Sequence, residues 1–137
     1  MADIEQIRAD KLSPGDIVEV NQGDFCPADI VLIKGKNISV MLDGAYETKD
    51  SIKFTRSRLP NYQKIIHFQD YAIKCQEPGF KEFYGLFVQS ATSIDIVQRE
   101  AIEPIDESNV IWAGSEVHSK ALGVVVYAGS DTKNFQE

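Results

Sequence analysis

The sequence predicts a single all-β domain, and three observations support that prediction. The chain has 137 residues, which is within the usual size of one domain and too few for two independent cores. Short apolar or alternating runs, several of them dominated by β-branched residues, recur between turn residues. A helical pattern is found only in residues 3–12, where Ile4, Ile7 and Leu12 share one face. We therefore expect strands almost throughout, with at most a short N-terminal helix.

The first third of the chain contains three predicted strands. They cover residues 16–20, 29–33 and 38–42, and proline, glycine or an Asp-Gly pair lies at their boundaries. The last of the three ends at Asp43-Gly44, a pair that is favoured in two-residue hairpin turns. Taken alone, this pair predicts a hairpin and nothing more.

The rest of the chain contains further predicted strands at a similar spacing. They cover residues 64–74, 83–89, 93–99, 110–112 and 122–127. The spacing approaches the roughly 8–12 residues that are typical of β-sandwich and β-barrel proteins. Two side chains within the predicted strands of the whole chain receive structural interpretations: Trp112 is expected in the core, and Asp29 is expected to cap a backbone turn.

The segment of residues 49–63 has neither the two-residue alternation of a strand nor a helical period, and we predict an exposed loop. It contains the one positive stretch of an acidic chain: Lys49, Lys53, Arg56, Arg58 and, directly after it, Lys64. Two interpretations stay open. The charges either cover a solvated surface or form a docking surface for an acidic or phosphate-bearing partner.

Charge and cysteine content exclude several classes of function. The net charge is −7, and a surface of that sign repels the phosphates of nucleic acids, so no nucleic-acid partner is expected. The sequence contains no run of about 18 apolar residues, so no membrane span is predicted. Cys26 and Cys75 are expected to be buried thiols, and with His67 and His118 they lack the close spacing of a zinc site, so no metal is predicted.

Four segments, taken in order along the chain, resemble one family. They are LSPGDIV at residues 12–18 with CPADIVL at 26–32, LDGAYETK at 42–49, CQEP at 75–78 with FYG at 83–85, and AG at 113–114 with GVVVYAGSDTK at 123–133. Together they resemble the actuator domain of type-four P-type ATPases, the phospholipid flippases. The likeness covers nearly the whole chain, about residues 11–133.

The resemblance implies a fold, a location and a set of partners. The fold would be a distorted jelly-roll, and residues 1–137 would form one actuator domain cut from a larger multi-pass membrane protein, at the cytosolic face of the membrane. Its partners would be the phosphorylation and nucleotide-binding domains of the same parent chain, a phospholipid bound by the parent's membrane helices, and an accessory membrane subunit. The chain itself has no nucleotide-binding motif and should not hydrolyse ATP, so ATP and Mg²⁺ would be cofactors of the parent alone.

The resemblance also implies catalytic residues. In the family, an aspartate of another domain becomes an acyl phosphate, and the actuator brings an acidic side chain on an Asp-Gly turn to the water that hydrolyses it. The family signature is L-D-G-E-T-N. Asp43 and Gly44 match it, but Ala45-Tyr46 follows where the glutamate belongs. Either Ala45-Tyr46 is an insertion and Glu47 and Thr48 occupy the catalytic places, or the two residues are substitutions and the site has lost its carboxylate.

Two hypotheses for the parent protein follow. In the first, it is an active ATP-driven phospholipid flippase, and this chain promotes hydrolysis of its aspartyl-phosphate intermediate. In the second, the chain belongs to a divergent, catalytically weakened flippase-like module that regulates a fused guanylate cyclase and hence cGMP synthesis, as in apicomplexan parasites and ciliates. The departure at Ala45-Tyr46 favours a divergent parent.

Overall fold

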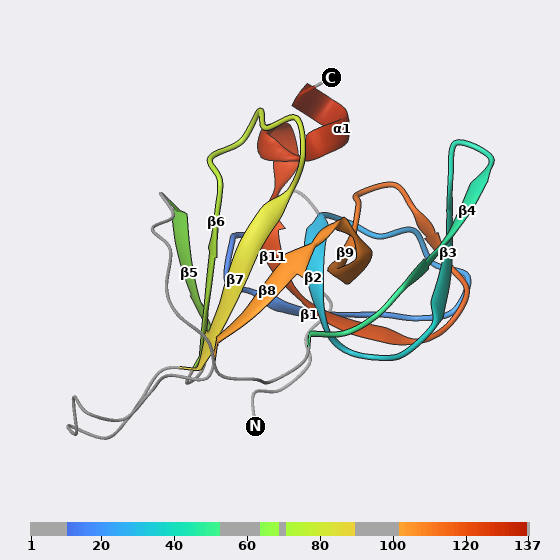
Figure 1. Ribbon diagram of the computed structural model, residues 1–137. Helices are drawn as coiled ribbons and strands as arrows, with labels where there is room; N and C mark the ends of the chain where they lie inside the picture. The colour runs from blue at the N-terminus through green and yellow to red at the C-terminus, as the bar shows by residue number, and fades with distance from the viewer. Residues whose placement is uncertain (1–10, 53–63, 69–70, 90–101, 137) are drawn as a thin grey trace.

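The all-β prediction is confirmed in the computed structural model, which describes residues 11–52, 64–68, 71–89 and 102–136. All strand pairs among these residues are antiparallel, and they form three sheets (Figure 1). Helical structure in the described part of the chain is confined to short elements such as η2 (Glu107–Asn109), η3 (Gly129–Asp131) and α1 (Lys133–Gln136).

The central sheet has the strand order β1-β11-β2-β9. Its members are β1 (Ile17–Val20), β11 (Ala121–Tyr127), β2 (Asp29–Lys34) and β9 (Val110–Ile111). β2 and β11 are nearly continuous runs of apolar, mostly β-branched residues, which is the pattern of strands that are covered on both faces. The two flanking sheets provide that cover.

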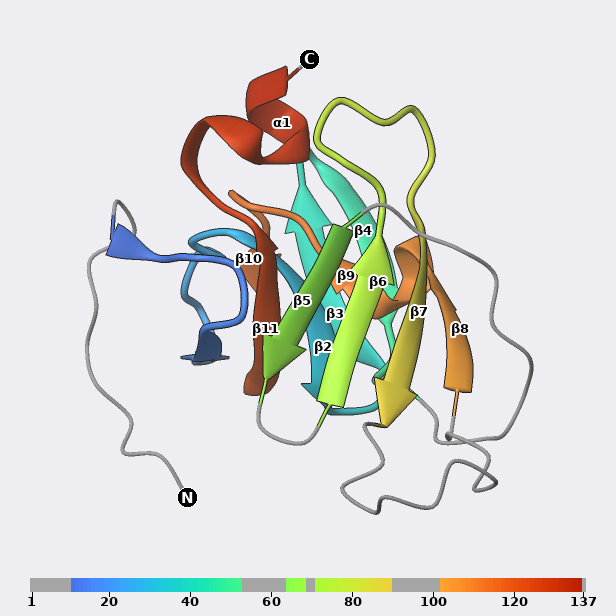
Figure 2. The same cartoon turned by 90° about the vertical axis from the view of Figure 1, so that its left-hand side faces the viewer.

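One flanking sheet has the order β10-β3-β4 and the other the order β5-β6-β7-β8. The first contains β10 (Glu116–Val117), β3 (Ile38–Leu42) and β4 (Ala45–Lys49). The second contains β5 (Lys64–Phe68), β6 (Tyr71–Cys75), β7 (Tyr84–Gln89) and β8 (Ile102–Asp106). Figures 1 and 2 show the β5–β8 sheet on one side of the β2 and β11 strands and the β3–β4 hairpin on the other.

Two hydrophobic cores lie on opposite faces of the central sheet, because successive side chains of a strand point to opposite faces. On β2, Val31 packs into the core that includes Ile73 and Ile105 of the β5–β8 sheet. Its neighbours Ile30 and Leu32 pack into the second core. That second core also includes Ile38, Val40 and Val117 of the β3–β4 side, so the hairpin is anchored directly to the central sheet.

Two sequence predictions need correction, and three strands were not predicted. The predicted strand at 64–74 is two strands, β5 and β6, which pair from Phe68 with Tyr71 to Lys64 with Cys75 and so satisfy each other's backbone groups. The predicted loop from residue 49 onward begins instead with the last residue of β4, and Lys49 is buried rather than exposed. The strands β4, β8 and β10 were not predicted from sequence.

Other predictions are confirmed or fall outside the described residues. Trp112 is buried in the first core, and Cys26 and Cys75 are buried cysteines that form no disulfide. Burial raises the pKa of the Cys26 thiol to about 12, so this thiol is protonated at neutral pH. The predicted strand at 93–99, most of the predicted helix at 3–12 and most of the predicted loop at 49–63 lie outside the described residues.

Candidate functional site

The Asp43-Gly44 pair forms the tip of the β3–β4 hairpin. Asp43 has φ of 51° and Gly44 has φ of 81°, and Leu42 pairs directly with Ala45 on either side of them. Positive φ at both central residues is the requirement of the type I′ turn, whose twist matches that of the two strands. Both turn residues are exposed, so the hairpin presents them to solvent.

The register of the hairpin shows how Ala45-Tyr46 is accommodated. Pairing continues without a shift from Leu42 and Ala45 at the turn to Ile38 and Lys49 at the base. A bulge would have brought Glu47 back towards the turn, but none is present. Ala45 and Tyr46 are therefore ordinary strand residues, and Glu47 lies on β4 at a distance of two residues from Ala45, the residue next to the turn.

The strand pleat separates the predicted catalytic residues. Glu47 pairs with the buried Val40, so its side chain projects from the face of the sheet that looks towards the core. Thr48 pairs with Ser39 and projects from the opposite face, where it is exposed. The structure thus places Asp43 and Gly44 at the turn and Glu47 and Thr48 on opposite faces of β4, and it does not bring the four together at one point.

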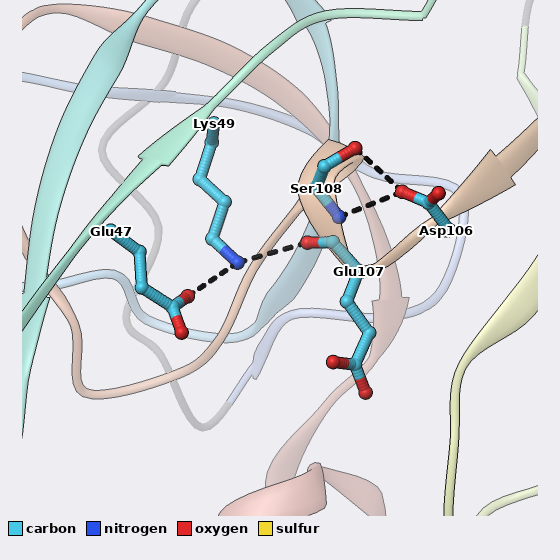
Figure 3. A network of polar contacts seen from close by, with 5 residues as sticks. All are labelled: Glu47, Lys49, Asp106, Glu107 and Ser108. Atoms are coloured by element: carbon cyan, nitrogen blue, oxygen red, sulfur yellow. Dashed lines mark hydrogen bonds and ion pairs between the residues drawn. The ribbon is translucent and has the colours of Figure 1, made fainter.

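Glu47 is joined to a lysine that the sequence interpretation had assigned to a loop. Lys49 projects from the same face of β4, and its Nζ lies 2.8 Å from Oε2 of Glu47 (Figure 3). The same Nζ donates a hydrogen bond of 2.9 Å to the backbone carbonyl of Glu107 in η2. The Lys49 side chain is 4% exposed and that of Glu47 is 58% exposed, so a buried ammonium group supports an accessible carboxylate.

The ion pair lowers the pKa of the carboxylate. The hydrogen bond from Lys49 is the main cause that lowers the pKa of Glu47, the positive charge of Lys49 is the second, and that of Lys133 makes a smaller contribution. Partial desolvation acts in the opposite direction and is outweighed. Glu47 is therefore ionised at neutral pH. It can accept hydrogen bonds from a water molecule, and it is a weaker base than an unpaired glutamate.

A second carboxylate, that of Asp29, is fully buried at the start of β2. Its Oδ1 accepts a hydrogen bond of 2.8 Å from the backbone N–H of Ala113, and its Oδ2 accepts one of 2.6 Å from the N–H of Lys133. Burial raises the pKa of Asp29 against the effect of these donors. The expected structural role is confirmed, although the backbone groups that Asp29 holds are distant in sequence. This carboxylate is not available to a substrate.

The described residues contain neither a metal-binding cluster nor a membrane-spanning helix. No cluster of three or more histidine, cysteine, aspartate or glutamate side chains with the geometry of a metal site occurs among them. None of the described helices is long and apolar enough to cross a bilayer. Sequence reasoning assigned Lys49 to an exposed positive loop and missed its pairing with Glu47. The signal for that pairing is Glu47-Thr48-Lys49, because an acid and a base two residues apart on a strand share one face.

Comparison with known proteins connects this hairpin to one family. Residues 2–136 match the family model of the P-type ATPase actuator domain. The chain is 26% identical over 136 residues to the human phospholipid-transporting ATPase IC, and this match covers 90% of the chain. It is 30% identical over 139 residues to the probable phospholipid-transporting ATPase 4 of Arabidopsis thaliana, covering 92%. It is also 30% identical over 140 residues to the probable phospholipid-transporting ATPase tat-5 of Caenorhabditis elegans, covering 94%.

These matches cover nearly all of the chain but only a small part of each relative. The chain spans 10% of the human and Arabidopsis proteins and 12% of the Caenorhabditis elegans protein. The names of these relatives refer to phospholipid transport and lend no support to the guanylate cyclase hypothesis.

Proposed function

This chain belongs to the family of P-type ATPase actuator domains, and on that premise we propose that it is the actuator of an ATP-driven phospholipid transporter. The names of its relatives support phospholipid as the transported class. The parent protein would supply the phosphorylation and nucleotide-binding domains, ATP, Mg²⁺, the membrane helices that bind the lipid and an accessory subunit. The actuator would lie at the cytosolic face of the membrane.

The proposed chemistry is the hydrolysis of an aspartyl phosphate in the partner domain. The oxygen of a water molecule attacks phosphorus, the acyl phosphate bond breaks, and the products are inorganic phosphate and the free aspartate carboxylate. The proton that the water loses passes to a carboxylate of the actuator, and such assistance is typically worth about 10²–10⁴-fold in rate. Glu47 is our candidate for that carboxylate. The observation that supports it is an exposed, ionised Glu47 held at 2.8 Å by Lys49 on the signature hairpin.

The position of Glu47 sets a condition on the docked state. A strand advances about 3.3 Å per residue, so Glu47 lies roughly 7 Å further from the turn than Ala45 does. Ala45 and Glu47 project from the same face, since they are two residues apart. The hairpin must therefore approach the phosphoryl group more deeply than one whose glutamate directly follows the glycine. Its narrow, exposed tip is compatible with that approach.

The test uses the full-length parent, phosphorylated with labelled ATP and Mg²⁺, and follows the decay of the phosphoenzyme. We expect Glu47→Gln to slow decay by about 10²-fold or more, because the amide cannot accept the proton. Glu116→Gln is the matched control, because Glu116 pairs with Met41 and projects from the opposite face of the same sheet. The phosphoenzyme of this variant should decay at the wild-type rate. Equal decay in Glu47→Gln and the wild type would exclude Glu47 from the reaction.

A deletion of Ala45-Tyr46 separates the two alignments of the signature. It places Glu47 directly after Gly44, as in the family signature. If the wild-type hairpin docks deeply with Glu47 in place, the deletion misplaces the carboxylate and slows decay, since a displacement of 1 Å can cost about 100-fold. Faster decay in the deletion variant would show instead that the two residues weaken the natural site. Absence of any phosphoenzyme in the wild type would contradict the transporter assignment itself.

A further inference from the structure

Lys49 occupies an unusual place for a lysine. It ends β4, an edge strand, yet its side chain is almost completely buried. Its partner across the hairpin is the buried Ile38, so the strand pleat directs it to the core-facing side. Burial of an ammonium group is unfavourable unless other groups replace the lost water, and here the Glu47 carboxylate and the Glu107 carbonyl do so.

The carbonyl that receives Lys49 is itself held in place. Asp106 caps η2, with the N–H of Ser108 donating to Oδ1 of Asp106 at 2.9 Å (Figure 3). The side-chain amide of Asn109 donates to the carbonyl of Asp50 at 2.9 Å, and the N–H of Asp50 donates to the carbonyl of Ser108 at 2.9 Å. Because Asp50 directly follows Lys49, η2 and the base of the hairpin form one hydrogen-bonded unit.

This geometry fixes one oxygen of Glu47 and leaves the other available. Oε2 is held by Lys49, whereas Oε1 has no hydrogen-bond or ion-pair partner among the residues that the structure describes. An exposed glutamate without a partner would move among several rotamers, and ordering it during the reaction would cost side-chain entropy. Glu47 is ordered in advance by a lysine whose own position is fixed at η2.

We infer that Lys49 is a positioning residue, which holds the Glu47 carboxylate so that Oε1 faces the water that attacks the aspartyl phosphate. The inference rests on the proposed function of the chain and extends it by one residue. Lys49 does not contact the reacting atoms and acts through Glu47. It performs this role from the buried side of the hairpin, which leaves the exposed side of Glu47 open to the partner domain.

Lys49 also determines the pH range over which Glu47 is charged. Of the elements around Glu47, β4 contributes Lys49, α1 contributes Lys133, and β3 contributes the uncharged Val40. The η2 element contributes the Glu107 carbonyl, while the Glu107 carboxylate extends away from the Lys49 ammonium group (Figure 3). Glu116 and His118 belong to β10 and the turn after it, and Glu116 projects from the other face of the sheet. Lys49 is therefore the main source of the lowered pKa of Glu47.

The test measures phosphoenzyme decay in the full-length parent as a function of pH. Lys49→Met removes the charge and keeps an unbranched chain of similar length, so we expect decay up to about 100-fold slower. The acidic limb of the pH profile should also move to higher pH, because the pKa of Glu47 is no longer lowered by Lys49. Lys49→Arg should restore most of the rate and return the limb towards its original position.

A second variant guards against a simple loss of folding. Lys49→Gln keeps a donor for the Glu107 carbonyl without the charge, and it should show the same shift of the acidic limb with a smaller loss of rate. Wild-type decay profiles in Lys49→Met and Lys49→Gln, with slow decay in Glu47→Gln, would overturn this inference and leave the proposed function intact. Unchanged decay in Glu47→Gln would overturn both.

Discussion

Asp29 and Glu47 are both acidic residues in segments that resemble family motifs, yet they differ in burial and in the groups that they contact. Asp29 is fully buried at the start of a central strand and accepts two hydrogen bonds from backbone groups 84 and 104 residues away. Glu47 lies on an edge strand, is more than half exposed, and contacts a side chain two residues away. Folding raises the pKa of Asp29 and lowers that of Glu47. The role of a motif carboxylate is thus decided by its burial and its partners.

The same contrast separates the two regions that contain these residues. Around Asp29, the central sheet is covered on both faces and joins distant parts of the chain. Around Glu47, the hairpin is a local structure, and its outer half is exposed to solvent. Substitutions in the central region should therefore reduce the free energy of unfolding, whereas substitutions in the hairpin should leave it nearly intact and alter function.

The largest expected effect on stability comes from Asp29→Ala. The backbone N–H groups of Ala113 and Lys133 lose their acceptor, and we expect a loss of about 3 kcal/mol in the free energy of unfolding. Asp29→Asn is the control, since its one remaining side-chain oxygen can serve one donor, and it should cost less. Urea unfolding followed by the fluorescence of Trp112, the single tryptophan, measures both. Wild-type stability in Asp29→Ala would contradict the structural role.

A matched pair of glycines gives the next largest difference. A Cβ atom at Gly123 in β11 would lie 2.8 Å from Cδ1 of Ile30 and 2.9 Å from the carbonyl of Val31, so Gly123→Ala should cost about 2 kcal/mol. A Cβ atom at Gly44 would meet nothing within 4 Å, and its cost comes from the positive φ alone, about 1 kcal/mol. The same unfolding measurement compares them. A greater loss for Gly44→Ala would show that the hairpin tip matters more to stability than its exposure implies.

The smallest predicted effect is a pair of pH dependences of opposite sign. Folding raises the pKa of Asp29 above its ordinary 3.8, so its contribution to stability falls as the pH rises through the window above 3.8. Folding lowers the pKa of Glu47, so its contribution is present above 4.5 and is lost as the pH falls through the lower folded value. Solvent screening at the exposed Glu47 limits its share to about 0.5 kcal/mol.

Unfolding at a series of acidic pH values measures this difference against two variants. The cost of Asp29→Asn should grow as the pH falls, and that of Glu47→Gln should shrink. Parallel changes in the two variants would contradict the opposite environments of the two carboxylates.

The sequence predicted the buried strands better than the exposed ones, and the physical reason lies in particular residues. The runs that became β2, β3 and β11 are apolar and β-branched, a composition that favours buried strands. The residues Ala45–Lys49 of β4 carry no apolar alternation, and their strand depends on pairing with β3. β8 contains Pro104, which is tolerated there because β8 is an edge strand.

The candidate site was predicted in part. The Asp-Gly hairpin follows from local turn preferences, and it is confirmed. The carbonyl of Glu107 in η2 that accepts from Lys49 is 58 residues from it along the chain, and only the folded structure brings the two together. The separation of Glu47 and Thr48 onto opposite faces required the strand assignment of β4, which the sequence did not provide. The catalytic role of the hairpin stays a prediction.

The order of strands in the central sheet has a consequence for how this domain forms on the ribosome. β11, which ends at Tyr127, lies between β1 and β2, which are complete by Lys34. At synthesis rates of about 5–20 residues per second, β1 and β2 wait on the order of 5–20 s for the strand that joins them. The β3–β4 hairpin and the β5–β8 meander, whose partners are neighbours in sequence, can pair as they emerge. The nascent chain therefore carries unpaired central-strand edges for most of the synthesis of this segment, and these edges need protection from association until β11 arrives.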